Sequence, residues 1–308
     1  MDIAVVGSNN VDLITYIDRM PKLGETLEAP DFEMGPGGKG ANQAVAASRL
    51  GAQVRMVTRV GSDIFAASTV KNFADNGIDT EWVLETDGPS GVAPIFVDKD
   101  SNNSIVIVKG ANGLLTPSDV EDAAEAIAAC KLLVLQLEIP LETVYAAIDL
   151  AVEGGVPVLL NPAPADPALD MAYVGRCTYF VPNETELSLL VGQDLSSLDD
   201  ITEAGRELLA KSELENLIVT LGSRGSLWLT ETEDVLIEAH SVAAVDSTGA
   251  GDAFIGCFAT RIVQGSDIPE AIAEASLYAA NSVTKRGTQY SYATAAEFEE
   301  WKTATTGK

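Results

Sequence analysis

Two glycine-rich segments carry the polar residues with the clearest chemical potential. The first reads Gly-Pro-Gly-Gly-Lys-Gly-Ala-Asn-Gln over residues 35–43. Its glycines would let the backbone come close to a ligand, and Lys39 and Asn42 could donate hydrogen bonds to sugar hydroxyls or to phosphate. The alternative is a glycine-rich turn that opens a helix, because the GxGxxG pattern alone is a weak indicator. The sequence contains no GK[ST] run, so this segment is not a Walker A loop.

The second segment reads Val-Asp-Ser-Thr-Gly-Ala-Gly-Asp-Ala-Phe over residues 245–254. It precedes an apolar helix that we expect to run to about Val263. Small residues at a helix start leave free N–H groups that favour an anion, and the helix dipole adds to this effect. Asp252 lies in the first turn, where an ionised carboxylate could accept the proton of an attacking hydroxyl during phosphoryl transfer. A simple capping role is the alternative for this residue.

The composition restricts the other kinds of chemistry. His240 is the only histidine, and Cys130, Cys177 and Cys257 form no CxxC pair, which argues against histidine-based triads, zinc motifs and disulfides. A net charge of −27 disfavours nucleic acid and anionic membranes as partners. No apolar run reaches the roughly 20 residues that span a membrane, and the N-terminus resembles a core strand rather than a signal peptide. We therefore expect a cytoplasmic protein.

Short apolar segments alternate with segments of helical spacing along most of the chain. This alternation predicts an α/β fold with a doubly wound, mostly parallel sheet and helices on both of its faces. The expected strands cover residues 3–7, 55–61, 132–137, 156–161, 179–183 and 217–222, and the expected helices cover 39–50, 118–129, 141–153 and 200–211. Several of these strands end in polar, loop-forming residues, and ligands of such folds bind beyond the carboxyl ends of the strands.

Two β-rich stretches interrupt the alternation. Segments 13–17, 91–97 and 104–108 favour strands, and the last two would form a hairpin around a turn at 98–103. We interpret these stretches, residues 13–34 and 90–110, as a small β-sheet lid that could cover the site. The main α/β domain would then comprise residues 1–12, 35–89 and 111–308.

The two glycine-rich segments together resemble the paired signatures of the pfkB, or ribokinase-like, carbohydrate kinase family. The signature matches fall on residues 38–47 and 246–252, and segments 161–165, 182–186 and 220–225 look like ribokinase motifs in the expected order. The resemblance therefore covers almost the whole chain. It implies a ribokinase-like fold and transfer of the ATP γ-phosphate, with Mg²⁺, to the primary hydroxyl of a sugar.

The resemblance also implies roles for individual residues. Asp252 would be the general base, and the anion hole would be formed by Gly249, Ala250 and Gly251. The sugar would contact Asn10, Asp12, Gly38, Lys39, Asn42, Glu138 and Asp252. The nucleotide would contact Asn183, Thr220, Gly222, Gly225, Gly251 and Ser276. Ribokinases commonly have Asn or His at the position of Ser276. Glu186 would act on Mg²⁺ through water. Potassium or another monovalent cation would activate the enzyme at a site formed by Asp246, Thr248, Ser282, Lys285, Gly287 and Ser291.

The identity of the sugar depends on one position. Segments 8–16 and 91–97 look especially similar to the deoxyribokinase branch, but that branch tends to have an apolar residue where this chain has Asn10, which matches ribokinases. A 2-deoxy sugar would leave an amide that is placed to bond the 2-hydroxyl unpaired. We therefore expect D-ribose to be phosphorylated at O5, with 2-deoxy-D-ribose as the alternative or a second substrate.

Other readings stay open at this point. A nucleoside kinase or another sugar kinase of the same family, or an inert sugar-binding relative, is an alternative to a pentose kinase. A Rossmann dehydrogenase is excluded because no glycine fingerprint follows the first strand. In relatives such lids often pair, so the resemblance also implies a homodimer through the lid.

Overall fold

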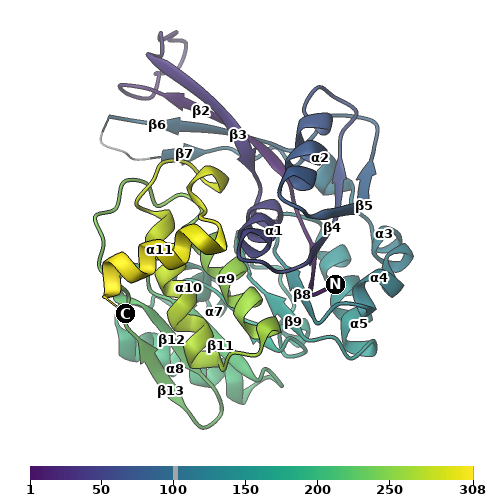
Figure 1. The fold of residues 1–308 in the computed structure, drawn as a ribbon, viewed down its shortest axis with the longest axis vertical. Helices are drawn as coiled ribbons and strands as arrows, with labels where there is room; N and C mark the ends of the chain where they lie inside the picture. Colours follow the sequence, from purple (N-terminus) through teal and green to yellow (C-terminus); the bar gives the residue numbers. More distant parts are fainter. Residues whose placement is uncertain (100–102, 308) are drawn as a thin grey trace.

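The larger sheet has nine strands, in a computed structural model that describes residues 1–99 and 103–307. The strands are β1 Ile3–Val6, β4 Val54–Val60, β5 Asp79–Glu85, β8 Leu132–Leu135, β9 Val158–Leu160, β10 Tyr179–Phe180, β11 Asn216–Thr220, β12 Ser226–Leu229 and β13 Asp234–Ile237. Their order is β13-β12-β11-β10-β9-β8-β1-β4-β5 (Figure 1). Every neighbouring pair from β11 to β5 is parallel, and β12 and β13 continue the sheet antiparallel. The predicted fold class is confirmed.

Helices cover both faces of this sheet. One face carries α1 Lys39–Arg49, α2 Ala66–Asp75, α9 Ala250–Gln264, α10 Ile268–Ser282 and α11 Ala295–Thr306, and the other carries α3 Pro117–Asp122, α4 Ala124–Ala128, α5 Leu141–Glu153, α6 Met171–Val174, α7 Glu184–Val191 and α8 Leu198–Ala210. Side chains of a strand point alternately to opposite faces, so Val5 packs with the first group of helices and Val6 with the second. The helix predicted over 118–129 is interrupted, because the backbone leaves the helical region at Ala123 (φ −88°, ψ 4°).

A separate four-stranded sheet forms the predicted small β unit. Its strands are β2 Asn10–Tyr16, β3 Asp31–Gly37, β6 Val92–Val97 and β7 Asn103–Ile105, in the order β3-β2-β6-β7. Strands β6 and β7 pair antiparallel, as the hairpin prediction requires, and residues 100–102 of its turn lie outside the described residues. Figure 1 shows β2 and β3 projecting from the body of the molecule. Both strands have one end at the main sheet, so Asn10 and Gly37 lie close to it.

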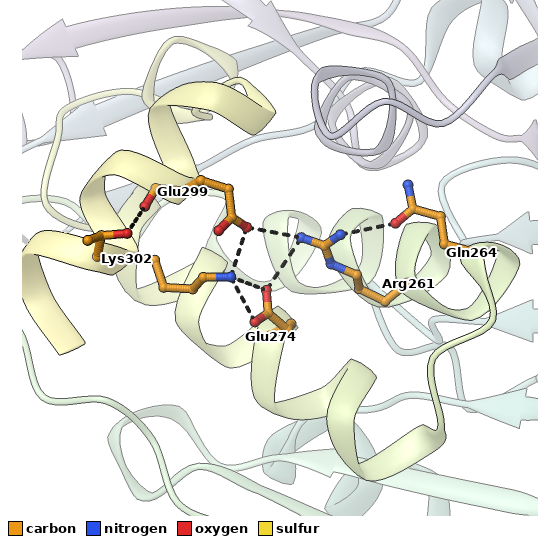
Figure 2. Close-up of polar contacts among 6 residues, drawn as sticks. Arg261, Gln264, Glu274, Glu299 and Lys302 are labelled. Carbon is orange, nitrogen blue, oxygen red and sulfur yellow. Dashed lines mark hydrogen bonds and ion pairs between the residues drawn. The ribbon is translucent and has the colours of Figure 1, made fainter. Parts of the chain in front are cut away.

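A cluster of charged side chains ties α9, α10 and α11 together (Figure 2). Arg261 of α9 and Lys302 of α11 both approach Glu274 of α10, at 3.4 and 3.1 Å. Lys302 also lies 2.8 Å from Glu299, and Arg261 donates to Gln264. Because Arg261, Glu274 and Lys302 are only 21–22% exposed, this cluster helps to hold α9 in place.

The three cysteines and the histidine pack against neighbouring side chains. Cys130, Cys177 and Cys257 are buried and unpaired with one another. His240 follows β13 by three residues and packs edge-on against Trp301, with a ring separation of 6.2 Å. Over the described ranges, no helix is long and apolar enough to cross a membrane.

Candidate active site

Helix α9 begins beside a turn that exposes its first amides. Gly249 precedes the helix with a left-handed φ of 75°, and its carbonyl accepts a hydrogen bond from the Tyr292 hydroxyl (2.9 Å). A Cβ at this position would lie 2.4 Å from Thr288, so only glycine fits. Within the described part of the chain, the N–H groups of Gly251 and Asp252 donate to no protein acceptor. They are therefore available to an anion.

Ala250 differs from the other two residues of the predicted anion hole. Its N–H already donates to the Ser247 carbonyl at 3.2 Å, which closes the turn before the helix. Gly251, in contrast, is exposed to the adjacent cavity. We therefore assign the free donors at this helix start to Gly251 and Asp252 rather than to Ala250.

The Asp252 carboxylate is buried and held at both of its oxygens. Asn42 Nδ2 donates to Asp252 Oδ2 (2.9 Å), and Gln43 Nε2 donates to Asp252 Oδ1 (3.0 Å). Both donors lie on α1, whereas Asp252 lies on α9, so the packing of these two helices assembles the group. Hydrogen bonds to an ionised group are each worth roughly 1.5–3 kcal/mol. They offset the cost of burying a carboxylate that is only 6% exposed.

Further amides orient these two donors. Gln136 at the end of β8 donates to Gln43 Oε1 (2.6 Å), and Gln289 donates to Asn42 Oδ1 (2.9 Å). With their oxygens engaged in this way, Asn42 and Gln43 must both turn their nitrogens toward Asp252. Besides α9 itself, three separate parts of the chain therefore set the geometry of the carboxylate.

A second buried carboxylate, Asp12, lies near the first. It is 8% exposed and accepts no hydrogen bond from any described residue. Burial, together with the charges of Glu138 and Asp252, raises the pKa of Asp12 to about 7. Gly37 on the paired strand leaves room for it, because a Cβ there would lie 2.1 Å from Asp12 Oδ1. An unbonded carboxyl group in this position can bind hydroxyl groups of a polyol.

Glu138 and Lys39 complete the charged groups of the site. Glu138 Oε2 accepts from the Ser8 hydroxyl (2.5 Å) and from the Lys39 backbone N–H (3.0 Å), which joins the end of β1 to the start of α1. Burial by itself would lower the pKa of the Lys39 ammonium, but the charges of Asp252, Glu138 and Glu186 outweigh it and raise that pKa. Lys39 is therefore a cation at neutral pH that faces three carboxylates.

Two adjoining cavities meet at the start of α9. The smaller, of about 180 Å³, is lined by Lys39, Asn183, Glu186, Gly251 and Asp252 among others. The larger, of about 420 Å³, extends from Thr220, Gly222 and Gly225 past His240 to Ser276. Thr220, Ser247, Ala250 and Gly251 line both cavities. A long ligand could therefore occupy the larger cavity and place its anionic end against the free amides.

The larger cavity contains a polar group that has no protein partner. Ser276 Oγ is buried and has no hydrogen-bond partner among the described residues. The loop after β11 is shaped by Gly225 (φ 102°), where a Cβ would lie 2.0 Å from the Ile237 carbonyl. These features agree with the predicted positions of nucleotide contacts, and the contacts themselves stay a prediction.

Asn183 and Glu186 begin α7 at the edge of the smaller cavity. Each side chain bonds the backbone N–H of the other residue at 2.8 Å. Burial raises the pKa of Glu186, and the hydrogen bond from Asn183 and the charge of Lys39 only partly compensate. The described residues contain no group of three or more His, Cys, Asp or Glu side chains that could hold a metal by themselves. A single carboxylate beside an anion site nevertheless suits Mg²⁺ that arrives with phosphates.

The predicted cation-binding residues come together only in part. The Asp246 carboxylate accepts from the N–H groups of Thr248 (2.9 Å) and Gly287 (3.0 Å), which joins the loop before α9 to the loop after α10. These bonds and the nearby Arg286 outweigh burial and lower the pKa of Asp246. The hydroxyl groups of Ser282 and Ser291 donate to local carbonyls, and Lys285 is exposed. A cation there would depend on backbone carbonyls.

Sequence reasoning named most of this site but omitted some of its residues. The structure brings Asp12, Lys39, Asn42, Glu138 and Asp252 into one polar group, and their contacts with a sugar stay a prediction. The residues that the sequence did not single out are amides or hydroxyls that contact the named ones, namely Gln43, Gln136, Asn112, Gln289 and Tyr292. Gln43 lies within the family signature at residues 38–47, next to Asn42, and this was its signal in the sequence.

Comparison with known proteins gives a consistent result. A family model described as pfkB family carbohydrate kinase matches residues 1–295. A deoxyribokinase of Salmonella typhi is 55% identical over 302 residues, which cover 98% of each chain. A ribokinase of Bacillus subtilis is 40% identical over 300 residues, which cover 97% of this chain and 98% of the relative.

A solved structure extends the similarity to the fold. The ribokinase of Arabidopsis thaliana, complexed with ribose and ATP, superposes with a TM-score of 0.88 at 30% identity. The match covers 97% of both chains. The agreement therefore includes the small sheet as well as the large one.

Proposed function

Because the chain belongs to the pfkB family of carbohydrate kinases, and is thus a phosphotransferase that acts on an alcohol group of a sugar, we propose that it phosphorylates the primary hydroxyl of a pentose. The observation that carries this proposal is the position of Asp252. Its buried carboxylate lies at the start of α9 in the lining of the smaller cavity, with both oxygens held by Asn42 and Gln43. We propose ATP as the phosphate donor.

In the proposed mechanism Asp252 accepts the proton of the sugar hydroxyl as the phosphoryl group is transferred. The free N–H groups of Gly251 and Asp252 bind the anionic oxygens of that group, and the Lys39 cation adds positive charge nearby. On the sugar, Asp12 accepts hydrogen bonds from ring hydroxyls. The small sheet, which contributes Asn10 and Asp12, acts as a lid that excludes water.

We propose 2-deoxy-D-ribose as the preferred sugar, converted to 2-deoxyribose 5-phosphate. The support is the identity of 55% to a deoxyribokinase, against 40% to a ribokinase over a similar length. This proposal replaces our expectation of D-ribose, which rested on Asn10 alone. D-ribose stays a second candidate because Asn10 is buried beside Asp12 on β2, where a polar group suits an extra hydroxyl.

Cations enter the proposal at two places. Mg²⁺, which neutralises the phosphates of ATP when bound, would lie near Glu186 with water between them. A monovalent cation such as K⁺ would lie against the loops that Asp246 joins, where it would stabilise the turn before α9.

We also propose a homodimer that forms through the small sheet. Its support is that Phe32 and Met34, two apolar residues on β3, are 56% and 54% exposed.

A coupled assay of ADP release tests the proposal. It compares kcat/KM for 2-deoxy-D-ribose and D-ribose, with and without K⁺, and uses fructose and adenosine as further acceptors. A higher value for 2-deoxy-D-ribose supports the proposal, and a higher value for D-ribose favours the second candidate. No turnover with either pentose would contradict it.

The same assay with Asp252→Asn tests the role of the base. The substitution keeps the shape of the side chain but removes its capacity to accept a proton. We expect kcat to fall by at least about a thousandfold while sugar and ATP affinity change little. Equal losses of binding and rate would contradict the assigned role.

A further inference from the structure

Asn112 is a buried polar residue that the proposed mechanism does not use. It lies on the 3-10 helix η1 (Gly110–Leu114) and is 1% exposed. Its amide forms hydrogen bonds with Asn9 and Asn10 at the start of β2, which are 103 and 102 residues away in the chain. Asn112 Oδ1 accepts from the backbone N–H of Asn9 (2.9 Å), and Asn112 Nδ2 donates to the Asn9 carbonyl and to Asn10 Oδ1, both at 2.8 Å.

These contacts allow only one orientation of the Asn112 amide. A backbone N–H can only donate and a backbone carbonyl can only accept, so Asn9 requires the oxygen of Asn112 on one side and its nitrogen on the other. The nitrogen of Asn112 then meets Asn10, which must present its own oxygen. The backbone of Asn9 therefore determines, through Asn112, which way the Asn10 amide points.

As a consequence, the free group of Asn10 is its nitrogen. Within residues 1–99 and 103–307, Asn10 Nδ2 has no hydrogen-bond acceptor. Asn10 and Asp12 are two residues apart on β2, so their side chains share one face of the strand. Gly91 packs directly against the Asn10–Asn112 hydrogen bond, because a Cβ on Gly91 would lie 2.2 Å from Asn112 Nδ2 and 2.3 Å from Asn10 Oδ1.

We infer that Asn112 is a positioning residue for sugar specificity, an inference that rests on the proposed function. By holding the Asn10 oxygen, it leaves an NH₂ donor free on the face of β2 that also carries Asp12, where the proposed function places the sugar and its 2-hydroxyl. That donor can bond the 2-hydroxyl oxygen of D-ribose and finds no partner at this carbon in 2-deoxy-D-ribose. The Asn10–Asn112 pair thus keeps D-ribose within the substrate range of a chain whose overall sequence is more similar to a deoxyribokinase.

The test is Asn112→Asp in the full-length enzyme, with kcat/KM measured for both sugars. A carboxylate can still accept from the Asn9 N–H but cannot donate to Asn10, so the Asn10 amide must turn its nitrogen toward residue 112 and away from the sugar. We expect the ratio of kcat/KM for D-ribose to that for 2-deoxy-D-ribose to fall about tenfold, as for one lost hydrogen bond. Asn10→Leu removes the donor itself and should lower the ratio by a similar factor.

A matched control separates positioning from general stability. Asn216 is a buried amide, 7% exposed, at the start of β11, where it donates to the Thr178 carbonyl and accepts from Trp228 Nε1. Asn216→Asp removes an equivalent bond away from the sugar cavity, so it should lower Tm without changing the sugar ratio. Both sugars are assayed on one preparation of each variant, so the folded fraction cancels from the ratio.

The outcomes are distinct. A lower ratio in Asn112→Asp and Asn10→Leu, but not in Asn216→Asp, supports the inference. Three results would overturn the inference and leave the proposed function intact. They are an unchanged ratio in Asn112→Asp and Asn10→Leu, an equal fall of the ratio in Asn216→Asp, and a wild-type enzyme that uses 2-deoxy-D-ribose but not D-ribose. A wild-type enzyme that phosphorylates neither sugar would overturn the proposed function, and this inference with it.

Discussion

Replacing Asp12 by asparagine should make the unliganded protein more stable at alkaline pH. The pKa of Asp12 is 3.8 in its ordinary state and about 7 in the folded protein, because the side chain is buried next to Glu138 and Asp252. Between these two values the folded protein holds the proton more tightly than the unfolded chain does. The free energy of unfolding therefore falls as pH rises through this window, by about 4 kcal/mol in total.

The asparagine side chain of the variant carries no titrating group, so the variant should not suffer this loss. We expect the stability of Asp12→Asn relative to wild type to increase by about 2–3 kcal/mol between pH 5 and pH 8, measured by urea unfolding at both values. The same variant should bind sugar poorly, because an amide replaces an acceptor-only carboxylate. Comparing the two proteins at each pH removes the contribution of the large net negative charge, which is common to both.

Asp119→Asn provides a control of opposite sign. Burial tends to raise the pKa of Asp119, but hydrogen bonds from Arg59 and Thr116 outweigh it and lower that pKa. Its contribution to stability is therefore present above the unfolded pKa, and the substitution should destabilise the protein at neutral pH. If the relative stability of Asp12→Asn did not change between pH 5 and pH 8, Asp12 would be ionised in the folded protein throughout, and the reasoning from its burial would be refuted.

Two further predictions concern the support of α9. Gln43→Leu removes one donor to Asp252 and the partner of Gln136. We expect kcat to fall about tenfold to a hundredfold, with a smaller change in the KM for sugar. An unchanged kcat would show that the hydrogen bond from Asn42 alone is enough to hold Asp252. Glu274→Gln leaves Arg261 and Lys302 with weakened partners and should cost about 1–2 kcal/mol, seen as a lower Tm. Glu299→Gln, at a side chain that is 54% exposed, should cost less, and equal effects would contradict the role given to burial.

Features that depend on local chemistry and periodicity could be predicted from the amino-acid sequence. Alternating apolar segments identified the parallel sheet, and small residues before an apolar run located the start of α9 and placed Asp252 in its first turn. The glycines of residues 35–43 indicated that the backbone comes close to another group; we expected a ligand, and the structure shows Gly38 and Gly40 against the backbone of Asn9 and Ser8. These features could be predicted because helix starts, strand ends and glycine turns are encoded within about ten consecutive residues.

The interactions among the polar groups could not be predicted, because they join segments that lie far apart in the chain. Gln43 and Asp252 are 209 residues apart, and Asn10 and Asn112 are 102 apart, so no local pattern relates them. The direction of an amide depends on the donors and acceptors that surround it, and the pKa of Asp12 depends on burial and on charges from other segments. For this reason the sequence could name Asn10 as an expected sugar contact but could not tell whether its oxygen or its nitrogen is left free for a ligand.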